Sequence, residues 1–169
     1  TKPKEQTALT LVQLRALAKE CGEFQTLVIL AGTTGMRWGE IAALQCKDVS
    51  LLNKTLYVGK AISTGLKGER VLGGTKTHQN RTIPFSKELL PALTLLIENK
   101  NPESHLFQMP GYGTLEYNNF MTRYFRPALE RCNLKGVGFH SLRHTTASLL
   151  ISQGTPITTV SKILGHAST

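Results

Sequence analysis

Two histidines and an arginine lie within one short segment of the sequence, His-Ser-Leu-Arg-His, which begins at His140. If the segment is helical, His140, Arg143 and His144 share one side, because residues three and four positions apart are neighbours on a helix surface. A third histidine, His166, follows Gly165 after a further apolar stretch. Such a grouping can bind an anion such as phosphate and can transfer a proton.

The same histidines also allow a metal site. His140 and His144 have the spacing of two zinc ligands on a helix, and His166 could be the third. In the zinc proteases with this spacing, a glutamate that acts as base directly follows the first histidine, whereas Ser141 stands there in this sequence. The sequence therefore favours a site without a metal, and a metal-dependent hydrolase stands as an alternative.

A second candidate site residue is Arg37, in the segment Gly-Thr-Thr-Gly-Met-Arg-Trp-Gly-Glu. Here a glycine-rich turn leads into a predicted helix, where backbone N–H groups favour an anion and a guanidinium can add two parallel hydrogen bonds to it. The alternative is a surface arginine that pairs with Glu40 three residues later.

A third basic position is Lys76, in the segment Gly-Gly-Thr-Lys-Thr-His-Gln-Asn-Arg. Lys76 lies near the tip of a predicted hairpin, with Arg81 on the returning strand. A lysine at such a tip can reach a bound strand of DNA and donate a proton. The alternative is a lysine that is merely solvated on a strand.

Helices must supply most of the scaffold for these residues. Thr10 followed by Gln13 predicts a capping box that begins a helix. The segment 24–35 is apolar almost all round, which predicts a buried helix ended by glycine, and 38–50 predicts another short helix. The chain after Ser86 again has the pattern of helices.

Between these helices the pattern changes to that of strands. Segments 53–63, 69–77 and 81–85 are rich in threonine, valine, isoleucine and tyrosine, and glycines separate them. They predict one small antiparallel sheet, with a hairpin turn at 78–80 and with Pro84 placing the last strand at an edge. The expected fold class is therefore α+β, mainly α, with a three-stranded antiparallel sheet in one domain.

Charge indicates the kind of partner. Twenty lysines and arginines against eleven aspartates and glutamates give a formal net charge of +9 in 169 residues, which favours double-stranded DNA or another polyanion. A membrane surface is disfavoured, because no basic helix has an aromatic face, and neither a membrane span nor a signal peptide is evident. The scattered thiols of Cys21, Cys46 and Cys132 favour a reducing compartment such as the cytoplasm.

Taken together, the motifs resemble the catalytic domain of the tyrosine recombinases, the phage-integrase family. The motifs occur in the family's order: Gly-x-Arg-x-x-Glu at 35–40, Thr-Lys-Thr at 75–77, His-x-x-Arg-His at 140–144 and Leu-Gly-His at 164–166. The lysine segment is most similar to integrases of Gram-positive phages and conjugative transposons. The resemblance covers essentially the whole chain and implies a helical catalytic domain that breaks and rejoins DNA strands through a 3′-phosphotyrosine intermediate, without a cofactor.

The resemblance also implies roles for individual residues. Arg37 and Arg143 match the two arginines that hold the scissile phosphate, and His166 matches a further position that contacts this phosphate. Lys76 matches the general acid toward the leaving 5′-oxygen, and His140 matches a histidine involved in proton transfer from the nucleophile.

Two more residues match supporting positions of the family. Glu40 matches an acidic residue that supports the first arginine and the lysine loop, and His144 matches a residue that supports the fold.

The attacking tyrosine is the one part that the resemblance does not locate within the chain. The family places it shortly after the final histidine, which here would be beyond Thr169. Tyr57, Tyr112, Tyr117 and Tyr124 all precede the His-x-x-Arg segment. We therefore expect residues 1–169 by themselves to be inactive in cleavage. A non-catalytic DNA-binding regulator on the same fold stands as the alternative function.

The domain organisation expected from the resemblance is a catalytic domain over residues 1–169, with 1–8 as a linker or leading arm. An N-terminal DNA-binding domain and the C-terminal tyrosine segment are expected to lie outside this sequence. The isolated domain is expected to be a monomer, and the full-length protein is expected to assemble as a tetramer on DNA, at the nucleoid in the cytoplasm of a bacterial or phage-host cell.

Overall fold

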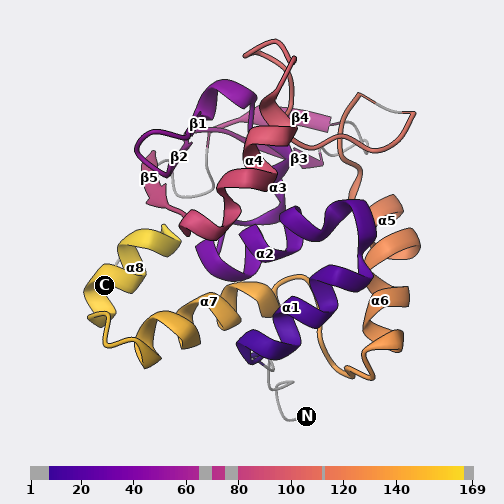
Figure 1. The fold of residues 1–169 in the computed structure, drawn as a ribbon, viewed down its shortest axis with the longest axis vertical. Helices are drawn as coiled ribbons and strands as arrows, with labels where there is room; N and C mark the ends of the chain where they lie inside the picture. The colour runs from indigo at the N-terminus through magenta and orange to yellow at the C-terminus, as the bar shows by residue number, and fades with distance from the viewer. Residues whose placement is uncertain (1–7, 65–69, 75–79, 112, 166–169) are drawn as a thin grey trace.

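A computed structural model describes residues 8–64, 70–74, 80–111 and 113–165 of the chain. Figure 1 shows a body of helices with the strands gathered at one end. The α-helices are α1 (Leu11–Glu20), α2 (Gln25–Thr34), α3 (Trp38–Ala43), α4 (Leu90–Ile97), α5 (Tyr117–Phe120), α6 (Arg126–Arg131), α7 (Ser141–Ser152) and α8 (Ile157–Leu164). Shorter helical turns are η1 (Gly22–Phe24), η2 (Cys46–Asp48), η3 (Lys87–Leu89) and the π-helical η4 (Met121–Phe125). The strands are β1 (Val49–Ser50), β2 (Thr55–Val58), β3 (Ala61–Thr64), β4 (Arg70–Gly73) and β5 (Arg81–Pro84).

The first two helices form as the sequence predicts. At the start of α1 the Thr10 hydroxyl accepts a hydrogen bond from the Gln13 N–H at 3.1 Å, and the Gln13 carboxamide accepts one from the Thr10 N–H at 2.9 Å. This capping box satisfies two donors that the first turn leaves free. The apolar α2 is packed between α1 and α7, and it ends at Gly35 with a φ of +70°. The buried helix at the centre of the molecule is thus confirmed.

The larger sheet has three antiparallel strands in the order β1–β2–β5. Leu56 on β2 lies opposite Ile83 on β5, and both side chains are buried in the core. The outer position of β5 confirms the edge strand that Pro84 predicts, because proline has no N–H to donate to a neighbouring strand.

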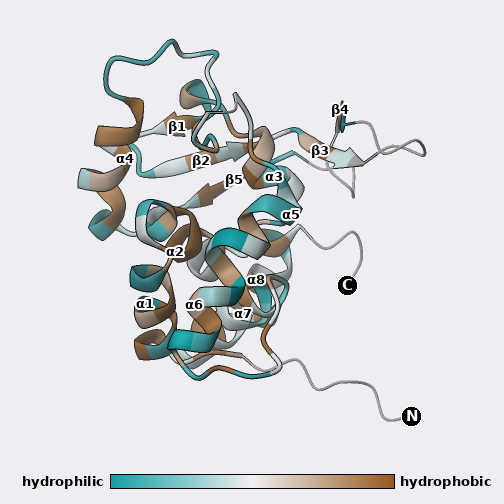
Figure 2. Ribbon diagram, turned by 90° about the vertical axis from the view of Figure 1, so that its right-hand side faces the viewer, coloured by the Kyte–Doolittle hydropathy of each residue, from teal (hydrophilic) through white to brown (hydrophobic). Residues whose placement is uncertain are grey.

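The predicted choice of strands for this sheet is wrong. Segment 53–63 forms two strands, β2 and β3, and these belong to different sheets. Over the described residues β4 pairs with β3 and β5 pairs with β2, so the predicted pairing of the last two segments is not the one that forms. The predicted turn at 78–80 falls mostly outside the described residues. All four residues of β4 are exposed, whereas Ile62 of β3 packs against the core, and Figure 2 shows the β3–β4 ribbon projecting from the body.

The C-terminal helices bring distant parts of the chain together. Figure 1 shows α7 running beneath α2, after which the chain turns back so that α8 lies beside β5. Val160 and Leu164 of α8 are buried, and the helix ends at Gly165 with a φ of +75°. Among the residues that the structure describes, no helix is both long enough and apolar enough to cross a bilayer.

Candidate active site

Arg37 lies where the turn after α2 enters α3, as the sequence predicts. Its backbone is extended, and its N–H donates a hydrogen bond of 2.9 Å to Oε1 of Glu40. The side chain is half-buried, and its Nη1 is enclosed with no acceptor among the described residues. A buried guanidinium nitrogen without an acceptor is uncommon, because an unmade hydrogen bond of this kind costs about 1–3 kcal/mol. The described residues thus leave one buried donor of Arg37 unsatisfied.

Arg143 lies in the first turn of α7, and its side chain reaches back to the same turn. Its Nη1 donates a hydrogen bond to the carbonyl of Gly35, two residues before Arg37, and its Nη2 donates one of 3.3 Å to the carbonyl of Leu164. Burial and then the nearby positive charge of Arg37 lower the pKa of Arg143 to about 10, so the guanidinium is protonated at neutral pH. The structure thus brings together two of the predicted site residues that lie far apart in the sequence.

Glu40 is the negative charge of the site, and its partner is Arg81 rather than the side chain of Arg37. Nη1 and Nη2 of Arg81 donate hydrogen bonds of 2.7 and 3.0 Å to the two carboxylate oxygens. Burial alone would raise the pKa of Glu40, but the hydrogen bonds from Arg81 and from the Arg37 backbone outweigh burial, and the pKa lies below its ordinary value. Because Glu40 is only 2% exposed, the alternative of a surface pair between Arg37 and Glu40 is wrong.

Together these residues make a local excess of positive charge. Three guanidinium groups and one carboxylate act on one another, and the carboxylate neutralises only Arg81. The charges of Arg37 and Arg143 are therefore left for a ligand. Two guanidinium groups match the two charged non-bridging oxygens that a phosphodiester develops when a nucleophile attacks it.

His140 is positioned by its neighbour in the sequence. Phe139 packs edge-on against Trp38, with ring centroids 5.3 Å apart and planes at 87°. Since Trp38 follows Arg37 and Phe139 precedes His140, this aromatic contact holds the start of α3 beside the start of α7. His140 immediately precedes α7 and is exposed, and His144 is exposed as well.

Two predicted site residues, Lys76 and His166, lie outside the described residues, so their roles stay predictions. Within the described part of the chain, no three histidine, cysteine, aspartate or glutamate side chains gather where they could hold a metal ion. The third ligand of the metal alternative, His166, is not among the residues searched.

The structure describes three of the four tyrosines. Tyr57 lies on β2 and is 47% exposed. Tyr117 packs edge-on against Trp38, and the Tyr124 hydroxyl donates a hydrogen bond of 2.8 Å to Glu23. Tyr112 is outside the described residues.

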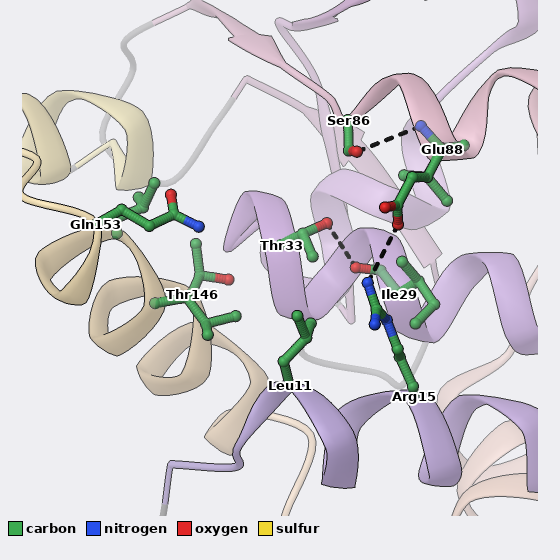
Figure 3. Close-up of a pocket in the computed structure, with 11 residues that line it drawn as sticks. Leu11, Arg15, Ile29, Thr33, Ser86, Glu88, Thr146 and Gln153 are labelled. Atoms are coloured by element: carbon green, nitrogen blue, oxygen red, sulfur yellow. Dashed lines mark hydrogen bonds and ion pairs between the residues drawn. The ribbon is translucent and has the colours of Figure 1, made fainter.

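A separate pocket of about 300 Å³ lies between α1, α2, η3 and α7, and Figure 3 shows its lining. Its polar groups bond to one another: Thr33 donates to the Ile29 carbonyl at 2.7 Å, and Arg15 lies 3.3 Å from Glu88. None of the three arginines of the candidate site lines it. The pocket therefore does not belong to the candidate site.

Sequence reasoning missed Arg81, which it treated as a charge on a returning strand. The signal was available in Glu40, an acidic residue inside an otherwise apolar segment that the fold buries. A buried carboxylate needs a cation, and Arg81 supplies it from an edge strand 41 residues further along the chain.

Gly165 gives a prediction of its own. Besides its positive φ, a Cβ at this position would lie 2.8 Å from Cζ of Arg81, whose guanidinium is held by Glu40. We expect Gly165→Ala to destabilise the domain by about 1–3 kcal/mol more than Gly154→Ala, because Gly154 has a similar φ of +84° but open space around it. Urea unfolding of the two variants measures the difference. Equal destabilisation would show that the Arg81 side chain moves away from the new Cβ without a cost in stability.

Comparison with known proteins assigns the chain to a family. Residues 8–169 match the model of the phage integrase family. The integrase of Escherichia phage 186 is 30% identical over 174 residues, which cover 98% of this chain and 42% of that protein. A tyrosine recombinase XerC-like protein of Caldanaerobacter subterraneus is 28% identical over 170 residues, covering 85% of this chain and 42% of that protein. The chain thus spans less than half the length of these relatives.

Solved structures show the same fold. The Tn1549 transposon integrase, solved in complex with circular intermediate DNA, has a TM-score of 0.83 at 20% identity over 99% of this chain and 61% of that one. The XerA recombinase has a TM-score of 0.76 at 22% identity over 99% of this chain and 58% of that one. The fold is that of a tyrosine recombinase catalytic domain. The chain belongs to the phage integrase family of tyrosine recombinases.

Proposed function

We propose that the chain is the catalytic domain of a site-specific DNA recombinase, which breaks and rejoins strands by transesterification. The observation that carries the proposal is that the Arg143 side chain reaches the turn that bears Arg37, where the described residues leave two positive charges unneutralised and one enclosed donor without an acceptor. Family membership supports the same reaction. Double-stranded DNA is the proposed partner, consistent with the net charge of +9 and with the DNA complex of the Tn1549 integrase.

In the proposed mechanism, Arg37 and Arg143 bind the non-bridging oxygens of the scissile phosphate and stabilise the charge that grows on them. A tyrosine hydroxyl attacks phosphorus, forming a 3′-phosphotyrosine as the bond to the 5′-oxygen breaks. His140 takes part in moving the tyrosine proton, Lys76 donates a proton to the leaving oxygen, and His166 adds a contact to the phosphate. The phosphotyrosine keeps the energy of the phosphodiester, so a new 5′-hydroxyl can rejoin the strand without ATP.

We further propose that none of the four tyrosines within residues 1–169 is the nucleophile, and that full activity needs chain outside this segment. The isolated domain is proposed to be a monomer, and four copies of the full-length protein are proposed to act on paired DNA sites at the nucleoid.

A nicked DNA substrate that traps the covalent intermediate tests whether the nucleophile lies within residues 1–169. The full-length gene product should form a protein–DNA adduct and residues 1–169 should form none. An adduct from residues 1–169 would show that the nucleophile is wrongly placed, and none from the gene product would favour a DNA-binding regulator.

DNA binding itself should depend steeply on salt, because each phosphate contact releases a counterion. For residues 1–169 we expect the affinity for duplex DNA to fall about tenfold or more between about 50 and 200 mM NaCl. Fluorescence anisotropy with labelled duplexes measures this slope. An affinity that hardly changes over this range would contradict a phosphate-binding surface.

An inorganic anion should stabilise the domain by filling the arginine pair. At a sulfate concentration about ten times its dissociation constant, we expect the unfolding midpoint to rise by about 3–5 °C relative to NaCl of equal ionic strength. The reason is that sulfate relieves the repulsion between Arg37 and Arg143 and accepts from the enclosed Nη1. The general salting-out effect of sulfate is measured with Arg143→Met, which should show the smaller rise. Equal rises in both proteins would mean that the arginines hold no anion.

A further inference from the structure

Arg81 joins three parts of the chain that are remote in sequence. Its guanidinium holds Glu40 of α3 through two hydrogen bonds, and its Nε donates a third, of 2.9 Å, to the carbonyl of Ile163 in the last turn of α8. Arg81 itself lies on β5. Its side chain is 9% exposed and that of Glu40 is 1% exposed, so the ion pair is shielded from water.

The bonds of Arg81 distinguish it from the two arginines of the phosphate site. Both terminal nitrogens of Arg81 face a carboxylate and its Nε faces a carbonyl, whereas Nη1 of Arg37 has no acceptor among the described residues. All three nitrogens of Arg81 are thus engaged within the fold, and Glu40 neutralises its charge. Arg81 is therefore suited to holding other groups in place.

Arg81 and Arg143 both hold the end of α8. Arg81 bonds the carbonyl of Ile163, and Arg143 bonds the carbonyl of the next residue, Leu164. Carbonyls at a helix C-terminus carry partial negative charge and have no partners within the helix, so two guanidinium groups stabilise this end strongly. Gly165 follows directly and lies against the Arg81 guanidinium, where a side chain has no room. This contact explains why a glycine stands in the Leu-Gly-His motif.

We propose that Arg81 is a positioning residue of the phosphate site. Through Glu40 it fixes the backbone of Arg37, and through Ile163 it fixes the end of α8, which Arg143 also contacts. The inference rests on the proposed recombinase function. Arg81 acts without touching the phosphate, and it sets the geometry between the start of α3 and the end of α8.

The variant Arg81→Lys separates positioning from stability. A lysine keeps the positive charge beside Glu40, but a single ammonium cannot present two parallel donors to the carboxylate and a third to Ile163 at the same time. We therefore expect Arg81→Lys to retain most of the thermal stability that Arg81→Met loses. A displacement of about 1 Å at a reacting centre can lower a rate about 100-fold, so we expect Arg81→Lys to cleave about 100-fold more slowly than wild type.

The experiment measures single-turnover cleavage of a nicked DNA substrate by the full-length gene product, along with its DNA affinity and unfolding midpoint. The expected result for Arg81→Lys is slow cleavage with DNA affinity within about threefold of wild type, since phosphate contacts made elsewhere on the duplex supply most of the affinity. The matched control is Arg123→Lys, an exposed arginine of η4, which should cleave at the wild-type rate. Recovery of both stability and cleavage in Arg81→Lys would overturn the inference and leave Arg81 as a partner in a structural ion pair.

A second measurement decides the matter if the wild-type protein does not cleave DNA, which would mean that the proposed function is wrong. The Gly165 N–H donates a hydrogen bond of 3.2 Å to the Lys162 carbonyl at the end of α8. Its hydrogen exchange in residues 1–169 should quicken about tenfold or more in Arg81→Lys, while the amides of α1 stay unchanged. Unchanged exchange at Gly165 would show that Arg81 does not hold this end of the helix.

Discussion

Replacing Arg143 with alanine should lower the rate of DNA cleavage by the full-length gene product about 100- to 1,000-fold, with a much smaller loss of DNA affinity. The physical reason is that the variant lacks one of the two guanidinium groups at the proposed phosphate site that no described carboxylate pairs with, and removing a single donor to developing charge costs about 100- to 1,000-fold in rate. Many other phosphate contacts hold the duplex, so binding suffers less. Single-turnover cleavage and fluorescence anisotropy on the same DNA measure the two effects.

The control for this prediction is Arg123→Ala, which removes an exposed arginine of η4 and should leave cleavage unchanged. Arg143→Lys should also cleave slowly, because an ammonium cannot span the Gly35 carbonyl, the Leu164 carbonyl and a phosphate oxygen as a planar fork does. If cleavage and affinity fell by the same factor in Arg143→Ala, the residue would be a binding residue without a special role in the transition state.

The largest expected effect on stability comes from Glu40. Glu40→Ala should destabilise the domain by about 3–5 kcal/mol at neutral pH, because it leaves Arg81 buried without its counter-ion and the Arg37 N–H without an acceptor. Urea denaturation followed by circular dichroism measures the change. Glu103→Ala is the matched control: Glu103 pairs with Lys47 at 2.9 Å but on an exposed surface, so its loss should hardly move the midpoint. Similar losses in the two variants would mean that the buried pair has no special weight.

The same carboxyl gives the stability a predicted dependence on pH. The pKa of Glu40 in the folded domain lies below its ordinary value of 4.5, so the unfolded state binds the proton more tightly. The contribution of Glu40 is therefore fully present above pH 4.5 and is lost as the pH falls through the lower, folded pKa. Glu40→Gln should remove this part of the acid sensitivity. A stability profile of identical slope in both proteins at acidic pH would contradict the shift.

Sequence patterns predicted the first two helices of this fold because caps and apolar periodicity act locally, whereas the helix predicted over 38–50 is wrong beyond Ala43, where the chain leaves α3 and reaches β1 at Val49–Ser50. The capping box at Thr10 and the buried helix that ends at Gly35 need only residues within a few turns of one another. The motifs around Arg37 and Arg143 likewise predicted helix starts, and the structure places both residues there. The order of these motifs was enough to predict the family, which the comparison with known proteins confirms.

Strand pairing could not be predicted from the sequence in this way, because an alternating pattern of apolar and polar residues identifies a strand without identifying its partner. Segment 53–63 has the composition of one long strand, but the chain bends at Gly59 and Lys60, and its two halves enter different sheets. The pairing of Val58 with Arg81 follows only once both strands are folded. For the same reason sequence reasoning could not match Arg81 with Glu40, since neither position carries any local mark of the other.

The enclosed Nη1 of Arg37 has a consequence for how such a domain evolves. Because this donor lacks an acceptor among the described residues, the side chain proposed to bind the phosphate also lowers the stability of the fold. Selection for strand exchange and selection for a durable protein then act on this position in opposite directions. In copies of the gene that no longer mobilise DNA, we expect apolar replacements to accumulate first at Arg37. The proteins that these copies encode should be more stable.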